Sequence, residues 1–193
     1  TDSFPPASDI PASLGSYGAP SIDAGSAPKG GWYPCAAFTV PSAKTVVDAM
    51  YPTNSKTPKS VDVRAYVYAS NVKAEAAFAV IQKKLSTCNG RRDTGEETGP
   101  PTQRTTTTTG QLPALAVTGV PALYVYGRTV PYPGAGNPAK NSGGSYEVLT
   151  LVNDTILMVE VTQDGKAGYT AAQKAAIQTF ADGAETTWAT ANP

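Results

Sequence analysis

Histidine is absent from this sequence of 193 residues. Its absence excludes every mechanism in which imidazole acts as a base, a proton shuttle or a metal ligand. Ser-His-Asp catalysis, Cys-His catalysis and the usual zinc sites are therefore excluded. The EF-hand loop, the phosphate-binding loop and the Gly-x-Gly-x-x-Gly motif are missing too. We expect no cofactor, no metal site and no catalytic residues; a hydrolase without histidine is the remaining catalytic hypothesis, and it requires buried, close carboxylates.

Charge is also scarce, because only 16% of the residues are charged, and 15 basic residues balance 15 acidic ones. Such a balance gives no electrostatic field that would gather nucleic acid or anionic lipid. With 18 Gly and 17 Pro, much of the surface must consist of Ser, Thr, Asn, Gln and loop backbone. This composition favours a protein that is extracellular or held in the cell envelope.

Long hydrophobic runs are missing as well, and none approaches the roughly eighteen residues that a membrane span needs. The chain starts with Thr1-Asp2-Ser3, without a Met or a signal sequence. We infer that a targeting segment was removed, which could be a cleaved signal peptide, a lipoprotein signal or a transmembrane anchor. A lipid anchor is therefore one of the possible modes of attachment.

Cys35 and Cys88 are the only two cysteines. In an oxidising compartment an even pair most often forms one disulfide, which would stabilise the fold by a few kcal/mol through its restriction of the unfolded chain. The alternative is that both are free thiols that act as small buried hydrophobic residues. The Trp-Tyr pair in residues 31–35 either lines a ligand pocket or packs beside that disulfide.

A β-hairpin is predicted for residues 146–152 and 155–162, which consist mainly of Val, Leu, Ile, Met, Thr, Tyr and Glu. Asn153-Asp154 lies between the two runs, and both residue types tolerate the positive φ of a two-residue hairpin turn. Glu160 is the one carboxylate that we place within a strand on the face of Ile156 and Met158; it either reaches water at a sheet edge or is partly buried and functional.

A helix is predicted to follow, because Thr170 and Gln173 have the spacing of a capping box. Ile177, Phe180, Ala184 and Trp188 recur at steps of three and four residues, so they lie on one helix face that must cover a sheet.

The same order of strand and helix occurs earlier. In residues 61–69, Val61, Val63, Ala65 and Val67 alternate with more polar residues, as in a strand buried on one side. Ser70 or Asn71 can cap a following helix, whose inner face is predicted to hold Phe78, Ile81, Leu85 and Cys88. We therefore predict an α+β fold with helices packed on a twisted, mainly antiparallel sheet, formed by ordinary layering or by a weak internal duplication.

Residues 1–31 are rich in Pro, Ser and Gly and are predicted to form an arm or linker, with residues 32–193 as a single domain. Apolar residues in the arm can dock it on the domain in places: Ile10, Leu14, Tyr17 and Ile22.

Between these segments the patterns are shorter. A short helix is expected over residues 42–50, after Pro41-Ser42. Residues 89–103 carry mixed charges among Gly and Pro, which is typical of a solvated loop or hairpin tip. The five threonines of 105–109 predict an edge or exposed strand. The remaining segments are predicted to be strands at 114–117 and 122–130 and a long loop at 131–145.

Two tyrosine pairs have strand spacing, Tyr66 with Tyr68 and Tyr124 with Tyr126. They could form an aromatic floor that binds a glycan or a lipid headgroup. Cross-strand aromatic packing explains the same spacing equally simply.

Several of these features form a pattern along the chain. Its first members are Cys35, the strand of residues 61–70 that leads into Ala74 to Phe78, and Cys88 at the end of that helix. The hairpin of residues 146–161 and the helix around Ala175 to Ile177 complete the pattern. This order resembles the PknH-type extracellular sensor-like domains of mycobacterial receptor Ser/Thr kinases and of related actinobacterial secreted proteins and lipoproteins. The resemblance covers roughly residues 32–188 and includes no catalytic motif.

The resemblance implies an α+β domain outside the membrane, whose sheet forms a cleft for an unidentified ligand. The kinase member of the family has a second cysteine pair, a kinase segment and a membrane span, all of which this chain lacks. These differences favour a free-standing or lipid-anchored relative.

Our leading hypothesis is a non-enzymatic sensor-like or ligand-binding module, with a small molecule, lipid or glycan bound near Tyr66, Tyr68, Tyr124 and Tyr126. The alternative is a structural or interaction protein of the cell envelope, which pairs with a partner protein through its arm and its Thr-rich edge strand.

Overall fold

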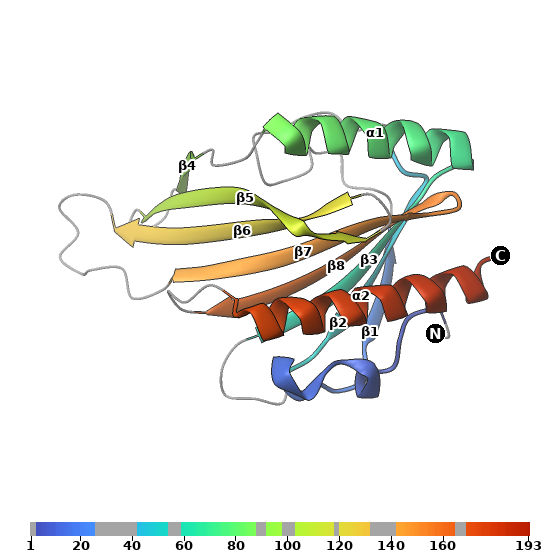
Figure 1. The fold of residues 1–193 in the computed structure, drawn as a ribbon, viewed down its shortest axis with the longest axis horizontal. Coiled ribbons are helices and arrows are strands. Elements are labelled where there is room, and N and C mark those ends of the chain that lie inside the picture. Colours follow the sequence, from blue (N-terminus) through green and yellow to red (C-terminus); the bar gives the residue numbers. More distant parts are fainter. Residues whose placement is uncertain are drawn as a thin grey trace.

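A computed structural model describes residues 3–25, 42–53, 59–87, 92–97, 103–117, 120–131, 142–164 and 169–193 of the chain. In this part of the chain, eight strands form one antiparallel sheet with two helices beside it (Figure 1). The strand order is β1-β2-β3-β8-β7-β6-β5-β4. This architecture confirms the predicted α+β class.

The strands are β1 (Ser21–Gly25), β2 (Thr45–Tyr51), β3 (Lys59–Val67), β4 (Arg92–Glu97), β5 (Gln103–Val117), β6 (Val120–Pro131), β7 (Ser142–Val152) and β8 (Thr155–Asp164). The helices are α1 (Asn71–Thr87) and α2 (Ala171–Ala191), with two short 3-10 turns, η1 (Ala7–Asp9) and η2 (Ala12–Leu14), near the N-terminus. None of the described helices is long and apolar enough to cross a membrane.

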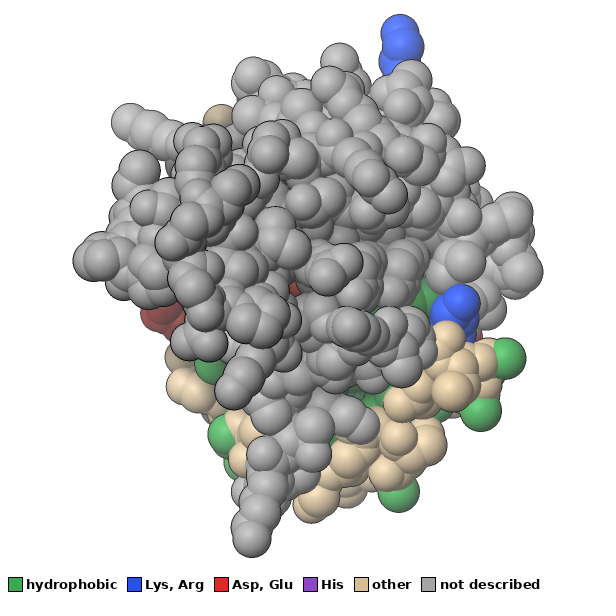
Figure 2. Space-filling view, turned by 90° about the vertical axis from the view of Figure 1, so that its left-hand side faces the viewer, with side chains coloured by type: hydrophobic (Ala, Val, Ile, Leu, Met, Phe, Trp, Pro, Cys, Tyr) green, Lys and Arg blue, Asp and Glu red, His purple; other side chains and the backbone are tan. Residues whose placement is uncertain are grey.

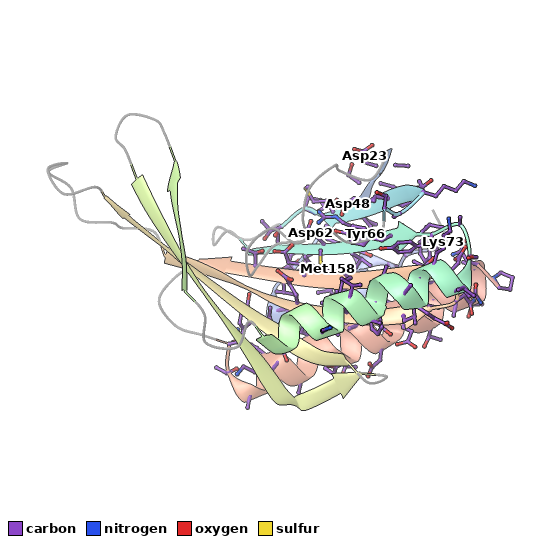
Figure 3. All side chains as sticks on the ribbon, turned by 90° about the horizontal axis from the view of Figure 1, so that it is seen from above. Asp23, Asp48, Asp62, Tyr66, Lys73 and Met158 are labelled. Carbon is purple, nitrogen blue, oxygen red and sulfur yellow. The ribbon has the colours of Figure 1, made fainter. Side chains whose placement is uncertain are left out.

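The two helices cover opposite faces of the sheet, α2 on one and α1 on the other (Figure 3). Ile177, Phe180 and Trp188 of α2 belong to the larger core cluster, as their spacing predicted. Phe78 and Ile81 of α1 belong to the smaller one. Side chains of β8 alternate between the clusters, with Leu157, Val159 and Val161 in the first and Ile156 and Met158 in the second. Burial on both faces explains why this strand is apolar almost throughout.

The hairpin of β7 and β8 and the start of α2 are as predicted. Asn153 has a φ of 52°, in the left-handed region that Asn tolerates. Thr170 accepts a hydrogen bond from the backbone N–H of Gln173, whose side chain accepts one from the backbone N–H of Thr170. This is the expected capping box.

The helix predicted over residues 42–50 is wrong, because Thr45–Tyr51 form strand β2. Thr45, Val46 and Val47 are consecutive β-branched residues, which lose side-chain freedom in a helix and fit a pleated strand. Ala49 and Tyr51 are both buried in the cluster under α2, and their spacing of two is that of a strand. Pro41-Ser42 misleadingly resembled a helix entry.

Two predictions about the middle of the chain are also corrected. Residues 92–97, expected in a loop or hairpin tip, form strand β4, which pairs with β5. The threonines of residues 105–109 lie in β5, which pairs with β6 as well and is therefore not an edge strand. The strands predicted at 114–117 and 122–130 lie within β5 and β6.

The N-terminal residues contribute to the core under α2. Phe4, Ile10 and Leu14 are all buried there, and the buried Tyr51 hydroxyl donates a hydrogen bond of 2.6 Å to the carbonyl oxygen of Pro5. Strand β1 then joins the sheet beside β2. The long loop predicted over residues 131–145 is too long, because β6 ends at Pro131 and β7 begins at Ser142. Other predictions lie outside the described residues and stay predictions: the boundary at residue 31, the Cys35–Cys88 disulfide, the motif of residues 31–35 and the remainder of that loop.

Candidate functional site

A pocket of about 800 Å³ opens at the end of the sheet where the two chain termini meet. Figure 1 shows both termini and the β7–β8 turn at the right-hand end of the molecule. The volume of the pocket lies within the range of about 300–1,000 Å³ that is typical of small-molecule sites.

The pocket owes its shape to the register of three strands. Thr45, Val67 and Thr155 are direct partners in one row across β2, β3 and β8, and all three line the pocket. Val47 lies two residues further along β2 and also lines it. Residues in one row of an antiparallel sheet share a face, so this wall combines aliphatic side chains with Thr hydroxyls.

An aromatic pair from the two ends of the chain lines the pocket as well. The rings of Phe4 and Trp188 pack with centroids 5.3 Å apart and planes inclined at 57°, and both side chains are buried. Trp188 reaches the pocket because the apolar face of α2 continues into the last turns of that helix.

Uncharged polar groups surround these apolar surfaces. The side-chain amide of Asn153 donates to the backbone carbonyl of Asn192 at 3.3 Å, which joins the β7–β8 turn to the end of α2. The hydroxyl of Thr155 donates to Oδ1 of Asp154 at 3.0 Å. Asn71 brings a further amide from the start of α1. The pocket is thus lined by hydrogen-bond donors and acceptors beside aromatic and aliphatic surfaces.

The described lining carries little charge. Asp154 is its only acidic or basic side chain. Activation of a Ser or Thr hydroxyl requires an adjacent base. The described lining has no Lys, and its one acidic side chain, Asp154, accepts a hydrogen bond from the Thr155 hydroxyl. In the described part of the chain, no group of three His, Cys, Asp or Glu side chains could hold a metal ion. A ligand here would be held by surface contact and hydrogen bonds.

A separate polar cluster lies on the α1 face of the sheet. Nη2 and Nε of Arg64 both donate to Oδ2 of Asp48, at 2.7 and 2.8 Å. Asp62 lies on the next row, where Ser60 donates to its Oδ2 at 3.0 Å. Burial raises the pKa of the Asp62 carboxyl, and the negative charge of Asp48 adds to this rise, while Ser60 and Arg64 oppose it. Figure 3 shows Asp48 and Asp62 on the neighbouring strands β2 and β3.

Asp62, Glu160 and Glu147 are direct partners across β3, β8 and β7. Glu160 therefore lies on a central strand and not at a sheet edge, and it is half-buried. The sequence had indicated Glu160 alone; its alignment with Asp62 and Glu147 depends on strand pairing, for which the sequence had no signal.

Of the four predicted tyrosines, the structure describes the side chains of Tyr66 and Tyr68. Tyr66 and Tyr68 both pack with the α1 cluster, where Tyr68 is only 3% exposed. Burial raises the pKa of Tyr68 to about 12 and also raises that of Tyr66, although a hydrogen bond from Arg64 opposes the rise at Tyr66. Tyr124 is the direct partner of Tyr146, which belongs to the cluster under α2.

The side chains of Tyr124 and Tyr126, which belong to β6, lie outside the described part of the structure. A common aromatic floor formed by all four tyrosines therefore stays a prediction. A role of each pair in binding stays a prediction.

Among the coloured atoms of Figure 2, few belong to charged side chains (blue and red), and the rest are hydrophobic side chains (green) or other side chains and backbone (tan). This agrees with the 16% of charged residues in the sequence. Sequence analysis missed the pocket because its residues come from both ends of the chain, four strands, two helices and a turn, and only Asn153-Asp154 carried a local signal.

The likeness of this chain to known proteins is one of fold. No family model matches the chain, and no curated protein matches it. Among solved structures, the crystal structure of the extracellular domain of PknH from Mycobacterium tuberculosis matches with a TM-score of 0.51 and 14% sequence identity, over 95% of this chain and 93% of that one. The chain therefore has the fold of the PknH extracellular domain, which confirms the predicted resemblance.

Proposed function

We propose that this chain is a non-enzymatic, sensor-like module that works outside the cytoplasm, in the extracellular space or the cell envelope, and binds a small ligand in the pocket between its termini. The observation that carries the proposal is the lining, in which aromatic and aliphatic surfaces stand beside Asn and Thr side chains. Location outside the cytoplasm is supported by the low charge of the sequence and by the extracellular origin of the matching structure.

The lining also indicates the class of ligand. Its apolar surfaces favour contact with CH groups, and its amides, hydroxyls and single carboxylate favour uncharged hydroxyl or amide groups. A glycan combines both kinds of surface, so it fits better than a strongly charged ligand. A bulk lipid tail fits less well, because it would leave the Asn and Thr side chains without hydrogen bonds.

Native mass spectrometry of the protein purified from its own host tests the proposal. Val67→Phe would fill the pocket, whereas Val72→Phe makes the same change at a side chain that is 73% exposed on α1. We expect an added mass on the wild-type protein and on the Val72→Phe variant, lost on denaturation, and a much smaller fraction of ligand-bound Val67→Phe. A wild-type protein without any retained mass, also after incubation with neutral oligosaccharides, would contradict the proposal.

The same measurement tests two further proposals. A Cys35–Cys88 disulfide predicts that the mass rises by that of two hydrogens on reduction. Ligand contacts by Tyr66 and Tyr124 predict that Tyr66→Ala or Tyr124→Ala lowers the bound fraction while the protein stays folded. If either variant only unfolds the domain, its tyrosine has a packing role.

A further inference from the structure

Strand β1 is one end of the sheet, and its outer edge is open among the described residues. It pairs with β2 on one side only. All five of its residues are exposed. Outside the pairing with β2, none of the backbone hydrogen bonds of the described residues involves Ser21–Gly25. Such an edge presents backbone N–H and C=O groups to which another strand can pair.

The charged side chains in the row of paired residues that ends at β1 are not all compensated. Asp23 is the direct partner of Asp48, which is in turn the partner of Arg64. Arg64 compensates Asp48 through an ion pair of 2.7 Å, but no described residue forms an ion pair with Asp23. Like charges directly opposite each other are unfavourable, and an opposite charge beyond Asp23 would relieve this. Figure 3 shows Asp23 and Asp48 on these adjacent strands.

The other face of β1 has a different character. Ile22 and Ala24 alternate with Asp23, and the side chain of Ile22 is 37% exposed and lines the pocket. A strand added beyond β1 would place the two neighbours of its central residue next to Ile22 and Ala24. Apolar residues at those two positions would cover the exposed Ile22.

A second copy of β1 fits this edge poorly. In the antiparallel register that overlaps all five residues, Asp23 would lie opposite the Asp23 of the other copy. Two carboxylates at directly opposed positions destabilise strand pairing. The edge therefore discriminates against its own sequence and in favour of a cation.

We propose that β1 is a docking edge for an extended segment of another protein, in which a Lys or Arg stands between two apolar residues and lies opposite Asp23. The segment adds a ninth strand to the eight-stranded sheet through backbone hydrogen bonds, and its basic residue sets the register. This interaction is separate from ligand binding in the pocket, although the docked segment would cover Ile22 at the pocket wall.

The test uses the full chain and a fluorescent peptide of about ten residues with Val-Lys-Val at its centre. Control peptides have Val-Glu-Val or Pro-Lys-Pro at the same place. Anisotropy measures binding, and hydrogen exchange of the β1 amides locates it. We expect the Val-Lys-Val peptide to bind most tightly and to slow exchange in β1. Asp23→Lys should weaken it about three- to tenfold and favour the Val-Glu-Val peptide instead, which follows from the size of cross-strand charge pairs.

Asp182→Lys is the matched control, because it makes the same charge change at an exposed position on α2. An equal loss of binding in Asp182→Lys would mean that only net charge matters and would overturn the proposal. Equal binding of the Pro-Lys-Pro peptide would also overturn it, since proline cannot donate to a strand ladder. So would β1 exchange that slows with protein concentration alone, because the occupant would then be a second copy.

Discussion

Phe4 packs against Trp188, so residues near the two ends of the chain meet in one aromatic contact with ring centroids 5.3 Å apart. Phe4 is only 6% exposed, which is unusual for a residue near a chain end. The contact also forms part of the pocket lining. The N-terminal segment is therefore a structural part of both the core and the candidate site.

Removal of this contact should destabilise the protein. Phe4→Ala is expected to lower the free energy of unfolding by about 3 kcal/mol, because it deletes a buried aromatic side chain and leaves a cavity beside Trp188. Urea unfolding followed by Trp fluorescence measures the change. Ser8→Ala, at an exposed position on η1, should stay within about 0.5 kcal/mol of wild type. Equal stability of the two variants would mean that the segment does not pack on α2 in solution.

Local patterns predicted the parts of this fold that depend on neighbouring residues. The alternation in β3, the turn at Asn153 and the capping box at Thr170 each lie within a few residues, and each was confirmed. The segment of β2 was misassigned because a proline suggested a helix entry, while the sheet partners that stabilise this strand lie elsewhere in the sequence. Tertiary pairing here outweighed a local signal.

The candidate sites depend on strand order, which no local pattern contains. Asp23, Asp48 and Arg64 form one row only because β1, β2 and β3 are neighbours in that order. The row of Asp62, Glu160 and Glu147 likewise follows from the pairing of β3, β8 and β7. Residue spacing within a strand shows which of its side chains share a face. Only the pairing of that strand with its neighbours shows on which face of the sheet those side chains lie.

Two buried tyrosines should respond in opposite ways to loss of their hydroxyls. The Tyr51 hydroxyl donates to the carbonyl oxygen of Pro5 at 2.6 Å, so Tyr51→Phe should lower the free energy of unfolding by about 1–2 kcal/mol. The Tyr146 hydroxyl is buried without a hydrogen-bond partner among the described residues. Tyr146→Phe should therefore leave stability unchanged or raise it by about 1 kcal/mol.

Because each variant loses one oxygen from a buried ring in the same core, the pair is internally controlled. Urea unfolding of both variants beside wild type gives the comparison. A loss in Tyr146→Phe as large as that in Tyr51→Phe would mean that the Tyr146 hydroxyl has a hydrogen-bond partner in solution.

Asp62 should make stability depend on pH. Burial raises its pKa in the folded protein above the ordinary value of 3.8. A raised folded pKa means that the folded state holds the proton more tightly than the unfolded state, so this group's contribution is fully present below 3.8 and is lost as pH rises through the folded pKa. The side chain of the Asp62→Asn variant cannot ionise. The stability of this variant relative to wild type should therefore increase as the pH rises from the unfolded to the folded pKa of Asp62, and then level off.

Urea unfolding over a range of pH measures this difference. Ser60→Ala is the informative companion, because it removes a hydrogen bond that lowers the pKa of Asp62. In that variant the loss of stability should extend to higher pH than in wild type. If the difference between Asp62→Asn and wild type is constant with pH, or has the opposite sign, then Asp62 is not held in a buried environment.

The contributions of Asp48 and Arg64 to stability should be coupled, because Nε and Nη2 of Arg64 share one carboxylate oxygen of Asp48. The side chains of Asp48 and Arg64 are only 31% and 30% exposed, respectively. Arg64→Met would leave Asp48 beside Asp23 and Asp62 without a compensating cation, at an expected cost of about 1–2 kcal/mol. Asp48→Asn should cost less, since it also removes a like charge from its two neighbours. A double-mutant cycle is expected to give a coupling energy of about 1 kcal/mol.

The cycle also bears on the open edge of the sheet. If Arg64 compensates Asp48, then loss of the Arg64 charge makes the row of residues that ends at Asp23 more negative. The Arg64→Met variant, provided that its sheet stays folded, should then bind the Val-Lys-Val peptide more tightly than wild type does. Asp48→Asn should weaken that peptide, because it removes negative charge one strand away from the docking position. A coupling energy near zero, together with unchanged peptide affinity in both variants, would mean that solvent already screens Asp48 and that the row does not act as a unit.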